Sequence, residues 1–144
     1  MIRDAYYIVV IGCGRLGAIL ASRLSSLGHS VVVVDRSEKA FGKLTAEFSG
    51  FTIHGNATEL AVLRQAKLDK ANFLLSTTDK DTVNLMVAQV AQTLFQVPMV
   101  IARVYDPAYE EIYHRLNVAV ISPTQLSATA FLQRIDSPTN KEPI

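Results

Sequence analysis

Three glycines and one acidic residue near the start of the chain have the spacing of a nucleotide-binding site. Gly12, Gly14 and Gly17 form the pattern G-x-G-x-x-G, and Asp35 follows about 20 residues later. In such a site the first glycine permits a tight turn, the second lets a pyrophosphate approach the backbone, and the third lets a helix pack closely on a sheet. The helix start attracts phosphates, and the carboxylate accepts hydrogen bonds from ribose hydroxyls. These residues therefore predict a site for a phosphate-bearing adenosine.

The segments around these residues have the pattern of a strand, a helix and a second strand. Residues 7–11 are an apolar run that ends directly before the glycines, and residues 31–34 are four valines that end at the acid. Between them, Leu16, Leu20 and Leu24 recur at helical spacing. The alternative is a glycine turn that only closes the crossover and binds nothing. Because the acid also occurs at the spacing of the motif, a binding site is favoured.

The rest of the chain alternates short apolar runs with segments of helical spacing. We expect further strands at residues 51–55, 72–76, 99–104 and 118–122, and helices at 37–48, after 58, after 79, after 106 and at 123–135. This alternation predicts an α/β fold, a Rossmann-like doubly wound parallel sheet of six strands in the order 3-2-1-4-5-6 with helices on both faces. One domain is expected to span residues 1–135, followed by a polar, disordered tail at 136–144.

Polar residues follow most of the expected strands, at the edge of the sheet where such folds bind ligands. Arg15 lies in the first turn of the helix after the glycines, where a cation opposes the helix dipole, so a phosphate partner is favoured. Arg36 has two open interpretations, stacking on an adenine or pointing into water. Asp79 is explained equally well as the N-cap of the next helix and as a ligand contact. His54 is interpreted as a loop histidine with satisfied ring nitrogens.

The composition excludes several classes of protein. The 144 residues are 49% hydrophobic with a formal net charge of +1, which fits a domain with a buried core and not a disordered chain. The sequence has no run of Lys and Arg, so we expect no nucleic-acid partner. The only cysteine, Cys13, cannot form an internal disulfide and has no ligand cluster for a metal. No apolar run reaches the roughly 20 residues of a membrane span, so we expect a soluble, cytoplasmic protein.

Six stretches together resemble the nucleotide-binding N-terminal lobe of the RCK family, also called KTN or TrkA-N. This family regulates potassium channels and the Trk/Ktr potassium uptake systems. The stretches are GCGRLG, VVVVDR, HGNATEL, TTDKDTVNL, ARVYDP and VISPTQL, and the resemblance runs from about residue 7 to residue 135. Gly-Asn-Ala-Thr and Thr-x-Asp-x-x-x-x-Asn are much more specific than the glycines. A catalytic dehydrogenase has no reason to carry both.

The resemblance implies a cleft that binds NAD(H) or ATP/ADP. The glycine loop and Arg15 would hold the phosphates, Asp35 the adenosine ribose and Arg36 the adenine. Arg103 would offer a second cation to the phosphates. Because Asp35 would repel a 2′-phosphate, NAD is favoured over NADP. The residues expected at the cleft are Gly12, Cys13, Gly14, Arg15, Leu16, Gly17, Asp35, Arg36, Asn56, Ala57, Thr58, Thr77, Thr78, Asp79 and Arg103.

The resemblance also implies a regulatory role. Such a lobe would sense an adenine nucleotide and control a membrane potassium channel or transporter, at whose inner face it would be held by that partner. It would form a homodimer or a larger ring, with the final helix and the helix of Tyr109 and Tyr113 packed against a second copy. In a lone domain the final helix could instead close the sheet edge. Thr124 stands where some members of the family have a cation-binding Glu, so no metal is expected.

Two enzymatic alternatives stay open. The first is a fragment of an NAD-dependent oxidoreductase, although the chain lacks a Tyr-x-x-x-Lys pair and a His–Asp couple for hydride chemistry. The second is a methyltransferase-type cofactor domain, which would carry a different glycine pattern. A non-catalytic ligand sensor is therefore the favoured interpretation.

Overall fold

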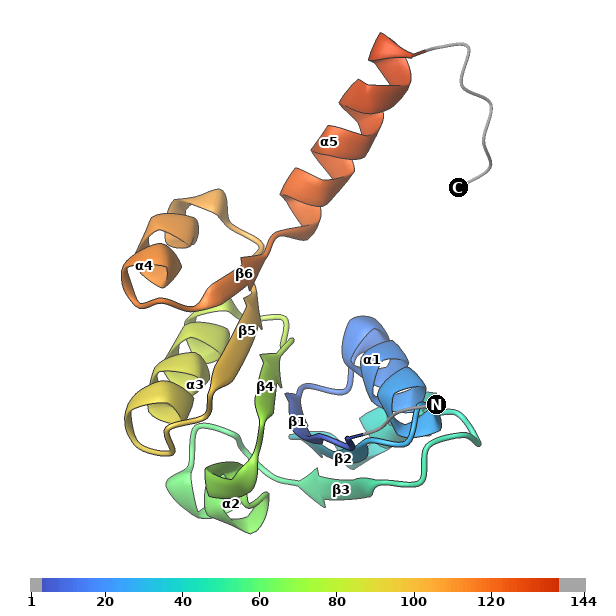
Figure 1. Ribbon diagram of the computed structural model, residues 1–144, viewed down its shortest axis with the longest axis vertical. Helices are drawn as coiled ribbons and strands as arrows, with labels where there is room; N and C mark the ends of the chain where they lie inside the picture. The colour runs from blue at the N-terminus through green and yellow to red at the C-terminus, as the bar shows by residue number, and fades with distance from the viewer. Residues whose placement is uncertain (1–3, 138–144) are drawn as a thin grey trace.

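Six parallel strands form the centre of the molecule, hydrogen-bonded in the order β3-β2-β1-β4-β5-β6 (Figure 1). The computed structural model describes residues 4–137. The strands are β1 (Tyr7–Ile11), β2 (Ser30–Asp35), β3 (Phe51–His54), β4 (Phe73–Ser76), β5 (Met99–Arg103) and β6 (Ala119–Ile121). The predicted doubly wound sheet and its strand order are confirmed.

Helices cover parts of both faces of the sheet. They are α1 (Arg15–Ser26), α2 (Leu60–Gln65), α3 (Asp81–Thr93), α4 (Glu110–Arg115) and α5 (Pro123–Asp136), with the 3-10 helices η1 (Glu38–Lys43), η2 (Leu68–Lys70) and η3 (Pro107–Tyr109). α1 and η1 pack on one face, and α2, α3 and α4 pack on the other. Among the described helices, none has both the length and the apolar character that crossing a membrane requires. Most of the predicted tail, residues 138–144, lies outside the described residues.

The central strands are buried on both faces of the sheet. Successive side chains of a strand point to opposite faces, and each face is covered by other elements. Ile8 and Val10 of β1 pack in one cluster with Ala18 and Ala21 of α1. Val9 packs on the opposite face with residues of α2 and α3. This arrangement explains why the strands are continuous apolar runs in the sequence. It also fixes β1 directly beside β4, so that their carboxyl ends meet at the centre of one edge.

The segment after β2 differs from the expectation. The sequence predicts a helix over residues 37–48, but the structure has only the short helix η1 there. The Ser22 hydroxyl on α1 accepts the N–H of Thr45 at 3.2 Å. The Ser25 hydroxyl accepts the N–H of Ser49 at 2.9 Å. Because these backbone donors are bound by α1, they do not form helical bonds, and the chain follows α1 as an irregular segment.

The helix α4 is fixed to its own domain by a buried tyrosine. Tyr113 is fully buried, and its hydroxyl donates to the carbonyl oxygen of Asp81 at 2.8 Å. The Asp81 carboxylate accepts the N–H groups of Tyr105 and Asp106 at 2.8 and 2.9 Å. Tyr113 therefore belongs to the core and joins α4 to the start of α3, whose Asp81 carboxylate holds the segment after β5. Tyr113 itself is therefore not available to a second copy, and the packing of its helix against one stays a prediction.

The last helix, α5, extends away from the sheet beyond β6 (Figure 1). No residue of α5 is buried. Its large apolar side chains Leu126, Phe131, Leu132 and Ile135 are between 61% and 73% exposed. The alternative in which this helix closes the sheet edge of its own domain is therefore wrong.

Part of the sheet is consequently left without a covering helix. The connections from β4 to β5 and from β5 to β6 place α3 and α4 on the same side as α2. On the opposite side, next to α1, the apolar side chains of β4, β5 and β6 line a hollow of about 440 Å³. We name this hollow the apolar face, defined by Leu20 and Leu24 of α1 and by Phe73, Leu75, Ile101 and Ile121 of the sheet.

Candidate functional site

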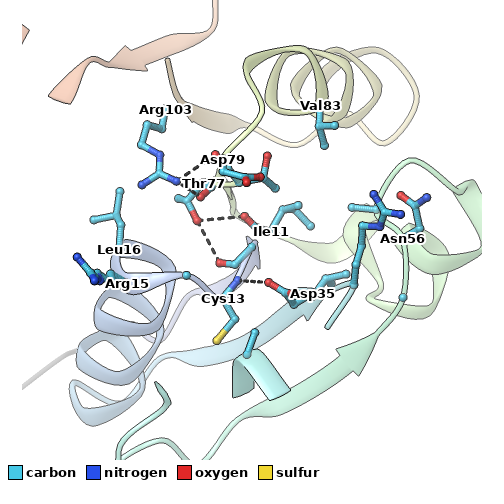
Figure 2. A pocket seen from close by; sticks show the side chains of 18 of the residues that line it. Ile11, Cys13, Arg15, Leu16, Asp35, Asn56, Thr77, Asp79, Val83 and Arg103 are labelled. Atoms are coloured by element: carbon cyan, nitrogen blue, oxygen red, sulfur yellow. Dashed lines mark hydrogen bonds between the residues drawn. The ribbon is translucent and has the colours of Figure 1, made fainter. Parts of the chain in front are cut away.

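A cavity of about 740 Å³ lies at the carboxyl edge of the sheet, where β1 is flanked by β2 and β4 (Figure 2). The chain runs outward from β1 to β2 and β3 on one side, then crosses to β4 on the other. Open α/β sheets bind ligands in the crevice at such a switch point. The loops that follow β1, β2, β3, β4 and β5 all contribute to its wall.

Nearly all of the predicted site residues meet in this cavity. Gly17 alone does not line it, because it lies under the loop. The predicted residues in the wall are Gly12, Cys13, Gly14, Arg15, Leu16, Asp35, Arg36, Asn56, Ala57, Thr58, Thr77, Thr78, Asp79 and Arg103. The further residues are Ile11, Val34, Ala40, Lys43, Gly55, Val83 and Tyr105. Several of these further residues could have been found from the sequence, because they lie at or next to the ends of predicted strands. Lys43 could not, because the sequence predicts that its segment is a helix.

The loop after β1 has the tight geometry that its glycines predict. Gly12 has a φ of +98°, and a Cβ there would lie 3.0 Å from the backbone nitrogen of Thr78. A Cβ on Gly17 would lie 1.8 Å from the carbonyl oxygen of Gly12, so only glycine lets α1 approach the end of β1. The Cβ position of Gly14 has no atom within 4 Å. Gly14 therefore presents open backbone to the cavity, where a ligand can approach it.

Thr77, which follows β4, holds the glycine loop in place. Its N–H donates to the carbonyl oxygen of Ile11 at 2.8 Å. Its hydroxyl lies 3.1 Å from the carbonyl oxygens of both Ile11 and Gly12, to which it donates (Figure 2). The ends of the two central strands therefore form one rigid rim of the cavity.

Asp35, at the end of β2, lines the cavity and also binds the glycine loop. Its Oδ2 accepts the N–H of Cys13 at 2.7 Å (Figure 2), and its Oδ1 accepts the N–H of Ser37 at 2.7 Å. A carboxylate has about four acceptor sites, so two remain for hydroxyl groups of a ligand. The side chain thus has a structural role that the spacing of the motif did not indicate.

Cys13 is expected to resist alkylation in the folded chain. Its side chain is buried, and burial, followed by the Asp35 carboxylate, raises the pKa of the thiol, which the nearby Lys43 offsets only in part. Because the thiolate is the nucleophile, the native chain should react with iodoacetamide at least roughly 100-fold more slowly than the chain in urea. Mass spectrometry follows the reaction. Equal rates in the two conditions would contradict the buried position of the thiol.

His54 holds the backbone of Arg36 and does not line the cavity. Its Nε2 lies 2.9 Å from the carbonyl oxygen of Arg36. This contact agrees with the interpretation of a satisfied loop histidine. The Arg36 side chain lines the cavity and is exposed. Its stacking on an adenine stays a prediction.

Asn84 on α3 is fully buried and organises the loop after β4. Its Oδ1 accepts the Ser76 hydroxyl at 3.1 Å, the Thr78 N–H at 2.9 Å and the Thr78 hydroxyl at 2.7 Å. Its Nδ2 donates to the carbonyl oxygens of Thr78 and Arg103, both at 3.0 Å. One amide therefore joins β4, α3 and β5 at the cavity wall. This role explains the asparagine of the Thr-x-Asp-x-x-x-x-Asn stretch.

Asp79 does not cap α3, contrary to one interpretation of the sequence. The helix begins at Asp81 after Lys80, and no side chain caps it. The Thr78 hydroxyl accepts the N–H of Lys80 at 3.3 Å instead. The network around Asn84 fixes this loop, so the Asp79 carboxylate is exposed at the cavity.

Replacement of Asn84 by alanine is expected to lower the free energy of unfolding by about 3 kcal/mol. The change leaves buried hydrogen-bonding groups of Ser76, Thr78 and Arg103 without partners, and each such group costs about 1–3 kcal/mol. Chemical denaturation followed by circular dichroism measures the effect. The matched control is Thr93→Ala, which removes an exposed hydroxyl that bonds within the same helix. A loss no larger than that of the control would contradict the role of the network.

Arg103 on β5 is a partly buried cation that forms no ion pair with any of the residues 4–137. Its Nη2 donates to the carbonyl oxygens of Thr77 and Thr78, and its guanidinium lies 4.6 Å from the centre of the Tyr105 ring. Its Nε is buried and has no hydrogen-bond partner among residues 4–137. The one ion pair in the described part of the chain lies elsewhere, on α4. Partial burial of an unneutralised charge is costly unless an anion lies nearby.

The charged side chains around the cavity favour an anion. One of the carboxylates already accepts two backbone N–H groups. The N-terminus of α1 adds N–H groups without a side-chain cap. Arg15 and Arg103 lie toward one end of the cavity and Asn56 toward the other (Figure 2). Four cations line the wall, Arg15, Arg36, Lys43 and Arg103, against two carboxylates, Asp35 and Asp79.

The sequence of the chain matches a known family over most of its length. The family model described as the TrkA-N domain matches residues 8–123. The chain belongs to the TrkA-N domain family. The Trk system potassium uptake protein TrkA of Streptomyces coelicolor is 35% identical over 138 residues, which cover 96% of this chain and 61% of that protein. A TrkA homolog of Methanothermobacter thermautotrophicus is 28% identical over 129 residues, which cover 90% and 59%. This TrkA-N chain thus spans about three fifths of the length of these curated relatives.

Solved structures with the same fold include other TrkA-N and RCK domains. The TrkA-N domain of the inner membrane protein ybaL from Escherichia coli superposes with a TM-score of 0.80 at 20% identity, covering 92% of this chain and 98% of that one. The GsuK channel bound to NAD gives 0.79 at 22% identity, covering 96% and 24%. The Kef CTD of Shewanella denitrificans in its AMP-bound form gives 0.76 at 21% identity, covering 94% and 83%. At these identities the similarity establishes the fold.

Proposed function

We propose that this chain is a regulatory domain that binds an adenine nucleotide, NAD(H) or ADP/ATP, and controls a potassium uptake system or potassium channel. The observation that carries the proposal is the convergence of the glycine loop, Asp35 and the unpaired Arg103 on one cavity. The relatives named as TrkA and the neighbours in complex with NAD or AMP support the same assignment. The domain would span residues 1–135.

The ligand would lie across the cavity with its phosphates at the cationic end. The adenosine ribose would bind the two acceptor sites that remain on Asp35, with the adenine near Arg36 and Asn56. The phosphates would lie over Gly14 and the start of α1, where the backbone is open and a helix N-terminus favours an anion. Arg103 would supply the second cation and gain the anionic partner that it otherwise lacks.

A sensor fits the cavity better than an enzyme does. In the described part of the chain, the cavity wall contains no histidine, and its single thiol is buried with a raised pKa. Hydride or acyl chemistry needs a positioned acid or base within reach of the substrate. The alternative, a fragment of an NAD-dependent oxidoreductase, predicts oxidation of NADH in the presence of carbonyl substrates. Robust turnover in that assay would reject the sensor.

The domain would act as a homodimer or a larger ring, in which α5 of one copy covers the apolar face of the other. Each copy carries both an exposed apolar helix and an uncovered apolar sheet face, which a two-fold axis would bring together reciprocally. A stable interface of this kind buries roughly 1,200–2,000 Å² of total surface. Such a dimer would be held at the inner face of the membrane by a channel or transporter subunit.

Thermal unfolding with a panel of ligands tests the proposed function. ADP, ATP, NAD, NADH and adenosine are compared, since a ligand of the folded state stabilises it by about 2.7 kcal/mol at 100 times its Kd. We expect the phosphate-bearing nucleotides to raise the melting temperature. The proposal is wrong if none of them does so, or if S-adenosylmethionine binds in their place.

A further inference from the structure

Two hollows of the molecule share part of their walls. The nucleotide cavity and the apolar face are both lined by Leu16, Thr77 and Arg103. Arg103 is the charged member of this shared wall. Whatever covers one hollow therefore changes the surroundings of a cation that also borders the other.

The base of α5 lies near the same residues. The Tyr105 ring packs against the Arg103 guanidinium at 4.6 Å. The Tyr105 carbonyl oxygen accepts the hydroxyl of Thr124, in the first turn of α5, at 3.5 Å. Each copy's own α5 thus begins against Tyr105, whose ring packs on Arg103. The α5 of a second copy would cover the apolar face that Arg103 also lines.

We propose that Arg103 couples nucleotide binding to the docking of a second copy, an inference that rests on the proposed function. An apolar helix on the apolar face would remove water from the guanidinium. Loss of water makes an unneutralised cation more costly and strengthens its attraction to an anion. A phosphate in the cavity offsets that cost. Phosphate binding and docking therefore strengthen each other, and by linkage the effect is equal in both directions.

The contacts of Arg103 determine which part of the ligand matters. The carbonyl oxygens of Thr77 and Thr78 orient the guanidinium but do not neutralise it, and its buried Nε has no hydrogen-bond partner in the described part of the chain. Adenosine has no charge to offset the desolvated cation. The coupling therefore follows the phosphates of the ligand and not the adenosine.

A thermodynamic cycle on the full chain tests this coupling. Phe131→Asp produces a monomeric reference, because Phe131 is 73% exposed on α5 and lies outside the core of its own domain. Arg103→Gln removes the charge, and Arg103→Lys keeps it. Calorimetry measures the Kd of ADP and of adenosine for each chain with and without the Phe131 change. Sedimentation measures dimer dissociation with and without ADP, and thermal unfolding verifies that each variant is folded.

We expect ADP to bind the wild-type dimer about tenfold more tightly than the Phe131→Asp monomer, a coupling of ordinary size, with no such ratio for adenosine. In Arg103→Gln the ADP ratio should fall to about one, and Arg103→Lys should keep more of it. An unchanged ratio in Arg103→Gln or an equal ratio for adenosine would overturn the coupling alone. A wild-type chain that stays monomeric with ADP would overturn the coupling and the proposed dimer, and would leave nucleotide binding by the domain standing. If the wild type binds none of ADP, ATP, NAD and NADH, the proposed function is overturned instead; if it binds one of the others but not ADP, the same cycle is run with that nucleotide.

Discussion

Replacement of Asp35 by lysine is expected to abolish adenine-nucleotide binding, with the affinity for ADP falling at least about 100-fold. The carboxylate offers two acceptor sites to the ribose hydroxyls, and hydrogen bonds to a charged acceptor contribute about 1.5–3 kcal/mol each. Lysine removes both and places an ammonium at the ribose. Isothermal calorimetry with ADP measures the change. Unchanged affinity would contradict the placement of the ribose.

The structural role of Asp35 requires a milder variant beside the charge reversal. Because Asp35 also binds the N–H groups of Cys13 and Ser37, lysine alters the glycine loop as well as the ribose site. Asp35→Asn keeps the size and one carbonyl acceptor, and we expect a loss of about tenfold in ADP affinity. The same change removes the charge that repels a 2′-phosphate, so NADP should gain relative to NAD. Thermal unfolding of both variants separates lost binding from lost structure.

Alanine at Gly17 is expected to lower the stability of the fold, whereas alanine at Gly14 is expected to lower the affinity for ADP. The new methyl group at Gly17 would lie 1.8 Å from the carbonyl oxygen of Gly12 and 2.9 Å from the Thr77 hydroxyl, so α1 must move away from β1. Overpacking against backbone costs about 3 kcal/mol or more, which corresponds to a fall of roughly 10 °C in Tm. Circular dichroism during heating measures this loss.

Gly14→Ala is the matched control for the same loop. No atom lies within 4 Å of the Cβ position at Gly14, and its φ of −77° is open to alanine. Its stability should stay within about 1 kcal/mol of the wild type. ADP affinity should fall about tenfold, because the methyl group occupies space that the pyrophosphate needs. If Gly14→Ala binds ADP like the wild type, the phosphates do not lie over this loop.

The binding unit could be predicted in detail because its signals are local. Val31 to Val34 and the run before Gly12 are apolar on every position, as strands covered on both faces must be. The glycine spacing and Asp35 follow from the fixed geometry of a strand, a turn and a helix. Parallel strands end at a common edge, so the residues after each strand, from Asn56 to Arg103, were expected together. The structure brings them to one cavity.

Other parts of the site depend on contacts between distant segments. Lys43 lines the cavity because the segment after β2 is irregular. That segment is irregular because Ser22 and Ser25 on α1 bind its backbone N–H groups. The periodicity of residues 37–48 indicates a helix, and it cannot show that hydroxyls on α1 bind the backbone of this segment. Asn84 is similar, since its position on α3 is in the sequence but its bonds to β4 and β5 are not.

The order of the strands, the glycine loop and the edge that carries the cavity were determined by the sequence alone, since each follows from patterns within a few residues and from the handedness of parallel crossovers. Tertiary structure alone decided that α5 leaves its own sheet and that Arg103 lies between the cavity and the apolar face. The physical reason is that an apolar helix shows which residues need burial but not which surface buries them. That choice depends on the shapes of surfaces that form only when the whole chain is folded.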